Sequence, residues 1–453
     1  MKKLLLGILV FTIVSCNNSK PINYTLFTGT IKNANSENLT IKNSSNEIVR
    51  EIKVAETGAF SDTIFNTNGY YKFSDGKESS SLFLKDGYNL HLNMNAKEFD
   101  ESMTYSGKGS DVNNFLAQKF LIKERIGTTP ELYSLDEVAY LSKMDEQKNA
   151  LEKSLANLPS DFVEQEKANI KYEYIDHVMK YQPAHGYFTK NKDFKVSKSF
   201  PNVLKGLDLN NEEHYKLFNT YKGIVGYNFS TSAREKAEKE NISFETAALQ
   251  LIKESKSKVI SNNLLADLSR QVSVRNPNAE ELYNGILELS TDETLREQLT
   301  KQFNKVQKLT KGKASPIFID YENNAGGALS LTDLKGKYVY IDIWATWCQP
   351  CKAEIPFLKE VEKKYHDKNI EFVSISIDAE KDHDAWKQMV KDKQLTGIQL
   401  MADSNWNSKF ITEYGVQGIP HFILIDPSGK IVSSYAPRPS DKKLIELFDE
   451  LKI

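Results

Sequence analysis

Two of the three cysteines in the chain have the spacing of a redox-active pair. Cys348 and Cys351 lie in the run Trp347-Cys348-Gln349-Pro350-Cys351, between an apolar segment and an amphipathic one. Two thiols three residues apart on the first turn of a helix can close a disulfide with little backbone movement. Backbone N–H groups and the dipole at a helix N-terminus also stabilise a thiolate. We therefore expect Cys348 to attack disulfides and Cys351 to resolve the mixed disulfide.

The cysteine pair has three alternative interpretations: half a zinc site, a peroxidase site and a structural disulfide. Half a zinc site needs two more ligands, and the sequence has neither a second Cys-x-x-Cys nor paired histidines. A peroxidatic cysteine follows a threonine by three positions, whereas Thr346 is two positions before Cys348. A structural disulfide stays an open alternative. We expect no bound metal and no cofactor.

Strands and helices alternate around this pair. Residues 338–344 form a near-continuous apolar run, typical of a strand buried on both faces. The pattern predicts a helix over 350–366, a strand over 371–377, helices over 382–393 and 408–414, a hairpin of 422–425 with 431–434, and a final helix over 440–451. This order predicts an α/β fold that places the cysteines between a buried strand and a helix.

Residues 315–453 resemble the thioredoxin-fold proteins, and in particular the membrane-anchored TlpA/ResA-like thiol-disulfide oxidoreductases. Asp342, six residues before Cys348, matches the buried acid of thioredoxins, and the resemblance implies that it shuttles the proton of Cys351. Glu354 matches an acid that the TlpA/ResA-like proteins hold beside the active site. Either residue could instead be a passive structural acid. The segments 315–318 and 331–337 look like the opening hairpin of the family.

The resemblance also implies a substrate-binding surface. Ile419-Pro420 matches the cis-proline loop, whose backbone pairs with substrate in β-strand fashion. His421 follows this loop and either lies near the disulfide or points into the sheet. The Gln349-Pro350 dipeptide places no histidine between the cysteines, which favours a reductant of moderate potential. The expected substrate-binding residues are Trp347, Gln349, Pro350, Ile419 and Pro420.

The rest of the chain belongs to other modules. The 453 residues, with 59 basic and 61 acidic side chains, predict several domains and argue against a dedicated nucleic-acid binder. Residues 22–110 show short, often alternating apolar runs, which predict an antiparallel β-sandwich. Residues 111–311 show helical periodicity, which predicts an all-α region, and residues 312–453 form the thioredoxin-like domain.

The third cysteine lies in an export signal. Lys2 and Lys3 precede about eleven apolar residues, too few to span a bilayer, so residues 1–15 are predicted to be a signal peptide. The run Ile13-Val14-Ser15-Cys16 resembles a lipobox, which implies lipidation of Cys16 and a tether over 16–21. An ordinary secretory signal with an incidental cysteine is the alternative. Asn17 favours outer-membrane sorting under the enterobacterial rule.

Together these features predict a lipid-anchored thiol-disulfide oxidoreductase of the cell envelope, facing the periplasm from the outer membrane. It is expected to reduce or exchange disulfides of exported proteins through the Cys348/Cys351 couple. The resemblance implies a membrane electron donor of the DsbD type. The alternative is a binding or scaffold lipoprotein in which the thioredoxin-like domain is accessory.

Overall fold

The computed structural model describes residues 22–44 and 46–453. The predicted signal peptide, the predicted tether and Cys16, the predicted lipidation site, lie outside these residues. The chain divides into two compact units, of which the first ends at Tyr227 and the second runs from Asn228 to Ile453. The predicted three-module boundaries stay a prediction. Within the described ranges, no helix is long and apolar enough to cross a membrane.

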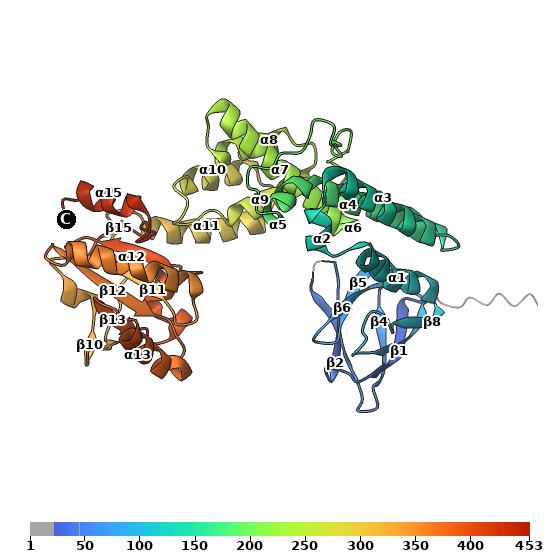
Figure 1. Ribbon diagram of the computed structural model, residues 1–453, viewed down its shortest axis with the longest axis horizontal. Helices are drawn as coiled ribbons and strands as arrows, with labels where there is room; N and C mark the ends of the chain where they lie inside the picture. The colour runs from blue at the N-terminus through green and yellow to red at the C-terminus, as the bar shows by residue number, and fades with distance from the viewer. Residues whose placement is uncertain (1–21, 45) are drawn as a thin grey trace, which may run out of the picture. The chain divides into compact units, whose positions relative to one another are not determined.

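The first unit begins with eight strands and continues with helices (Figure 1). Its strands are β1 (Tyr24–Lys32), β2 (Asn38–Lys42), β3 (Ile48–Lys53), β4 (Ala59–Phe65), β5 (Asn68–Ser74), β6 (Ser79–Lys85), β7 (Asn89–Asn95) and β8 (Thr104–Lys108). Its helices are α1 (Ser110–Ile126), α2 (Thr129–Ser134), α3 (Glu137–Ser154), α4 (Ser160–Met179), α5 (Tyr181–Phe188), α6 (Glu212–Leu217) and the start of α7 (Asn219–Glu240).

The strands form two four-stranded sheets, with orders β4-β1-β7-β8 and β3-β2-β5-β6. Their inward side chains, among them Phe27, Leu92, Ile41 and Phe73, share one apolar core. The strand pairs of these two sheets are antiparallel, as predicted, except that β1 and β7 pair in parallel. The register of such a long-range pair depends on which apolar faces meet, and no turn between the two strands specifies it.

The second unit contains four further helices and a seven-stranded sheet. The helices are α8 (Phe244–Glu254), α9 (Lys258–Ser269), α10 (Ala279–Leu289) and α11 (Glu293–Lys308). They are followed by β9 (Tyr321–Asn323), β10 (Ala328–Leu329), η1 (Leu331–Leu334), β11 (Tyr338–Trp344), α12 (Gln349–Tyr365), β12 (Ile370–Ser376), η2 (Glu380–Asp382), α13 (His383–Asp392), β13 (Ile398–Met401), η3 (Asn405–Asn407), α14 (Lys409–Glu413), β14 (His421–Ile425), β15 (Ile431–Ser433) and α15 (Lys442–Glu450).

The sheet order is β10-β9-β13-β12-β11-β14-β15, with β11, β12 and β13 parallel and β14 antiparallel to β11. Helices α12 and α15 cover one face, where Tyr340 packs with Leu358 and Phe448. Helix α13 covers the other face, where Ile341 and Ile343 share a core with Trp386. Burial of β11 on both faces explains its near-continuous apolar sequence. This layering is the predicted thioredoxin-like α/β fold (Figure 1).

Two parts of this sheet differ from the prediction. Strand β13, whose sequence is Ile-Gln-Leu-Met, was not predicted, since four residues give too short an alternation to recognise. The opening hairpin is formed by β9 and β10, which lie between the two segments that the resemblance suggested. Gly326 and Gly327, both at positive φ, make its turn.

Candidate active site

Cys348 and Cys351 form a disulfide at the N-terminus of α12. Their Cα atoms lie 5.3 Å apart, and Cys348 is the N-cap of the helix. The backbone N–H of Cys351 donates a hydrogen bond of 3.2 Å to the Cys348 Sγ atom. This is the contact that would stabilise a Cys348 thiolate after reduction, together with the helix dipole. Pro350 suits the first turn because it has no N–H to leave unpaired.

Cys348 and Cys351 are both buried. In the disulfide form the two differ little, at 4% and 3% exposure. Accessibility comes instead from the neighbouring residues: Gln349 and Pro350 are exposed, and Trp347 is 54% exposed. A partner disulfide would therefore approach across these three residues.

Asp342 lies in β11, beneath α12, as the resemblance implied. It is buried, and its Oδ1 atom has no hydrogen-bond partner among the described residues. Asp342 lines a small cavity together with Cys351. Burial, reinforced by the charges of Glu362 and Glu354, raises the pKa of the Asp342 carboxyl to about 8. The group can thus take or release a proton near neutral pH, beside the cysteine predicted to need one.

Glu354 is buried in α12 but is held by the segment before α15. Its carboxylate accepts hydrogen bonds from the backbone N–H and the Oγ of Ser440, at 3.0 and 2.9 Å. The Arg438 Nη1 atom lies 3.6 Å from the Glu354 Oε1 atom. The charge of Glu354 reaches the active site through its effect on the Asp342 pKa. Its contacts give it a structural task, while the predicted catalytic role stays a prediction.

The peptide bond between Ile419 and Pro420 is cis, as the resemblance implied. Ile419 packs against the core that contains both cysteines, and Pro420 is buried. His421 begins β14 and points into the protein, where its Nε2 lies 2.9 Å from the Ser434 carbonyl oxygen. Burial lowers the pKa of His421 to about 4, so the ring is neutral at pH 7.

Comparisons with known proteins found sequences and solved structures that are similar to part of this chain. The chain is 30% identical to the thioredoxin domain of a thiol-disulfide oxidoreductase from Bacteroides vulgatus, covering 32% of this chain and 98% of that one, with a TM-score of 0.28. The model of the Redoxin family matches residues 308–446. The thiol-disulfide oxidoreductase ResA of Bacillus cereus is 33% identical over 151 residues, which cover 33% of this chain and 83% of the relative. The chain belongs to the ResA family of thiol-disulfide oxidoreductases.

Membership of this family makes the protein an enzyme of thiol-disulfide exchange, and its Cys348–Cys351 disulfide fits the redox pair that this chemistry requires. ResA of Bacillus subtilis, at 29% identity, aligns over 128 residues. These alignments cover about a third of the chain or less. With the Redoxin match over residues 308–446, they describe the C-terminal domain.

Two residues near the ResA-like site were missed by the sequence analysis. Asp378 follows β12 and accepts hydrogen bonds from the backbone N–H and Oγ1 of Thr346, which fixes the loop before Cys348. Its position directly after a buried strand was the available signal, because the carboxyl ends of neighbouring parallel strands meet at one edge. Trp406 faces Trp347, with ring centroids 6.5 Å apart. Nothing in the sequence around Trp406 indicated that contact.

Arg275, from the loop after α9, was also missed. Its Nη2 donates a hydrogen bond of 3.3 Å to the carbonyl oxygen of Gly418, directly before the cis-proline loop. Its guanidinium lies 4.9 Å from the ring centroid of Tyr435. The helical part of the second unit therefore supports the backbone of the predicted substrate-binding loop.

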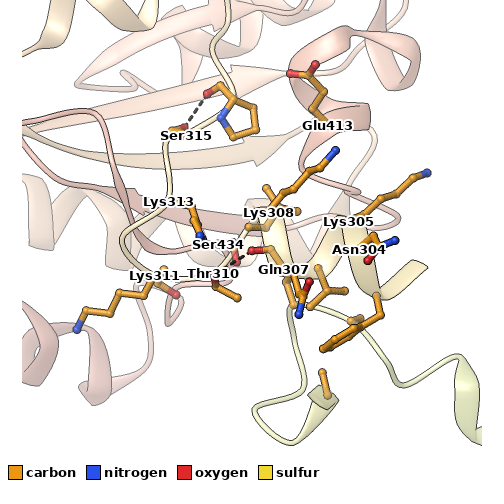
Figure 2. A pocket seen from close by; sticks show the side chains of 18 of the residues that line it. Asn304, Lys305, Gln307, Lys308, Thr310, Lys311, Lys313, Ser315, Glu413 and Ser434 are labelled. Atoms are coloured by element: carbon orange, nitrogen blue, oxygen red, sulfur yellow. Dashed lines mark hydrogen bonds between the residues drawn. The ribbon is translucent and has the colours of Figure 1, made fainter. Parts of the chain in front are cut away.

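A second cleft in this unit is lined by the end of α11 and the segment that follows it (Figure 2). Lys305, Lys308, Lys311 and Lys313 lie around it, with Glu413 on α14. Among the described residues that line it, none belongs to the Cys-x-x-Cys segment or to the cis-proline loop. The cleft is therefore separate from the redox site. No group of three potential metal ligands occurs in the described ranges.

Proposed function

We propose that this protein is a lipid-anchored reductase of disulfides in exported proteins. The observation that carries the proposal is the Cys348–Cys351 disulfide at the N-terminus of α12, above the buried Asp342 carboxyl. Cys348 attacks a substrate disulfide as a thiolate, and Cys351 then attacks the Cys348 sulfur and releases the reduced substrate.

The proposed direction of electron flow rests on the residues between the cysteines. Gln349 and Pro350 carry no positive charge, so the Cys348 thiolate is stabilised by the helix terminus without help from a cation within the motif. A thiolate that is only moderately stabilised makes the reduced protein a better electron donor than it is in strong oxidants. A transmembrane thiol carrier of the DsbD type would return the couple to its reduced form.

The proposed location rests on the N-terminal sequence. The basic, apolar and lipobox-like segments before Cys16 support export and lipidation, and Asn17 supports an outer-membrane anchor with the protein facing the periplasm. In that compartment structural disulfides form and persist, so disulfide-containing exported proteins would be available as substrates.

The Cys351→Ser variant is expected to trap mixed disulfides between Cys348 and its substrates. Without the resolving thiol, the adduct formed by Cys348 cannot be released within the protein. Cells that produce this variant should yield adducts that appear as additional bands in non-reducing electrophoresis. A reductant should cleave these adducts. Mass spectrometry of these adducts would identify the substrates.

The matched control is the Cys348→Ser variant, which keeps one thiol at the motif but removes the proposed attacking one. It should trap few or no adducts. If Cys348→Ser traps the adducts and Cys351→Ser does not, the proposed order of attack is wrong. Recovery of no adducts from either variant counts against a substrate-reducing role.

The Cys16→Ser variant is expected to move from the membrane fraction to the soluble fraction of the cell envelope. Loss of the thiol removes the site of lipid attachment, and acyl chains supply the binding energy of such an anchor. Fractionation followed by immunoblotting measures the change, with Ser19→Ala as a control in the same segment. If Cys16→Ser stays with the membrane, lipidation at this residue is not what anchors the protein.

A further inference from the structure

Three polar side chains lie side by side on adjacent strands of the sheet, beneath α12. Asp342 of β11 is the register partner of Ser374 of β12, which is the partner of Gln399 of β13. All three residues are buried. Since partners in adjacent strands share a face of the sheet, these side chains form a polar row on the face that α12 covers.

This row borders the cavity beside Cys351. Trp344, two residues after Asp342, lines the same cavity. Three of the lining residues carry a buried polar atom without a partner among the described residues: the Asp342 Oδ1, the Gln399 Oε1 and the Trp344 Nε1. Two acceptors and one donor are the set that a single water satisfies, by accepting from the indole N–H and donating to both oxygens. The volume open to the centre of a water molecule is about 10 Å³, close to what one water needs.

Glu362 completes the lining of this cavity from α12. The residue is buried, and burial raises the pKa of its carboxyl. Its Oε2 accepts a hydrogen bond from the Oγ1 of Thr396, a residue exposed to solvent. The Glu362 carboxyl therefore lies between the cavity and the surface.

The backbone makes room for this carboxyl. Gly397 has a φ of 68°, and a Cβ atom there would lie 2.8 Å from the Glu362 Oε1 and 2.9 Å from the carbonyl oxygen of Phe372. A larger residue at position 397 would displace Glu362. A buried carboxyl is costly unless it is satisfied or used, and this one has its own hydrogen bond and its own space.

The charged groups around Asp342 come from one element. Glu354, Glu362 and Lys359 all belong to α12, and the other polar residues that line the cavity opposite this helix, Ser374, Thr396 and Gln399, are uncharged. Glu354 is held by Ser440 and Arg438, whereas Glu362 shares the cavity with Asp342. The Lys359 Nζ donates to the carbonyl oxygen of Lys393. Of the two α12 carboxyls, only Glu362 lines this cavity together with Asp342.

We propose that Glu362 is a positioning residue that carries the proton between Asp342 and solvent during the resolving step. The Cys351 thiol gives its proton to Asp342, and the Cys351 thiolate attacks the Cys348 sulfur. The Cys348–Cys351 bond forms, the bond from Cys348 to the substrate breaks, and the substrate sulfur leaves with the electron pair and takes a proton from solvent. Once protonated, Asp342 donates to the cavity water instead of accepting from it, which frees one hydrogen of that water to pass to Glu362. Glu362 then releases a proton at Thr396.

The inference rests on the proposed order of attack and holds for the exchange reaction with any disulfide. It differs sharply from a purely electrostatic role. The charge of Glu362 raises the Asp342 pKa, so removing that charge alone would leave more Asp342 ionised at pH 7 and would speed the loss of the Cys351 proton. Removing a proton carrier would instead slow the loss of the Cys351 proton.

The test is a stopped-flow reaction of the reduced protein with one equivalent of 5,5′-dithiobis(2-nitrobenzoate). The first thionitrobenzoate reports attack by Cys348, and the second reports resolution by Cys351. In Glu362→Gln we expect the second phase to slow about tenfold at pH 7, with the first phase unchanged. Glu362→Asp, which keeps a carboxyl, should restore most of the rate. The control Glu360→Gln removes an exposed acid from the same helix and should change neither phase.

An unchanged or faster second phase in Glu362→Gln, with its pH profile moved to lower pH, would overturn the inference and leave Glu362 with an electrostatic effect alone. Should Glu362→Gln fail to fold, Thr396→Val removes the hydrogen bond at the solvent end while keeping the side-chain shape. It should slow the same phase, and an unchanged rate would again overturn the inference. The proposed function fails separately, if the wild-type protein shows no first phase.

Discussion

Replacing Cys348 with serine abolishes the reduction of insulin disulfides by the reduced protein. A serine hydroxyl stays protonated at pH 7, even at the N-terminus of α12, whereas a thiol in that position is partly ionised. Since only the ionised form attacks, we expect a loss of at least about a thousandfold. The rate of insulin reduction is measured from the turbidity of the precipitating insulin B chain, with dithiothreitol as the electron source.

The matched control is Cys16→Ser, which removes a cysteine from outside the ResA-like domain. It should reduce insulin at the wild-type rate when both proteins are assayed in the same detergent. Full activity in Cys348→Ser would contradict the assignment of the attacking thiol. A loss equal to that of Cys348→Ser in the control would show that the assay depends on the anchor rather than on the redox pair.

Replacing Asp342 with asparagine stabilises the oxidised protein at alkaline pH. The folded protein holds the Asp342 pKa at about 8, well above the usual value near 4 of an unfolded chain. Between these values the folded state binds more protons, so wild-type stability falls as the pH rises from about 4 and the loss is complete above about 8. Asparagine does not titrate and escapes this loss.

The expected advantage of Asp342→Asn at pH 9, relative to its effect at pH 4, is about 3–5 kcal/mol. All four tryptophans, Trp344, Trp347, Trp386 and Trp406, belong to the second unit. Tryptophan fluorescence during denaturation with urea therefore follows the unit that contains Asp342. Titrations at a series of pH values give the free energy of unfolding of each variant.

The control for this prediction is Asp403→Asn, the same substitution at an exposed position of the same unit. Its effect on the free energy of unfolding should not change with pH. A flat difference between Asp342→Asn and the wild type over the same range would mean that the buried carboxyl does not have the raised pKa. In that case the proposed proton transfer from Cys351 would lose its acceptor.

The redox pair and its immediate supports were predictable because they are local. Cys348 and Cys351 share one helical turn, and Asp342 lies six residues upstream on the strand that leads into it. Strand and helix periodicity fix such placements without knowledge of the remaining fold. The cis bond before Pro420 was implied by family resemblance for the same reason, since it depends on a short motif.

The parts that were missed all depend on contacts between distant segments. The parallel pairing of β1 with β7 and the insertion of β13 beside β12 are choices among many possible strand neighbours. Asp378, Trp406 and Arg275 each reach the active-site region from a separate element. The position of Asp378 directly after a buried strand was a signal for this edge of the sheet, whereas the sequences around Trp406 and Arg275 carry no pattern that indicates their contacts.

The sequence by itself determined the chemistry, because two thiols, a helix start and an upstream acid are encoded within ten residues. The tertiary structure alone decided where the proton goes. It brought Gln399 of β13 and Glu362 of α12 to one cavity with Asp342, and it placed Gly397 where a side chain would have displaced the Glu362 carboxyl. Strand register and helix packing set these distances, and both follow from which apolar faces are buried together rather than from any local run of residues.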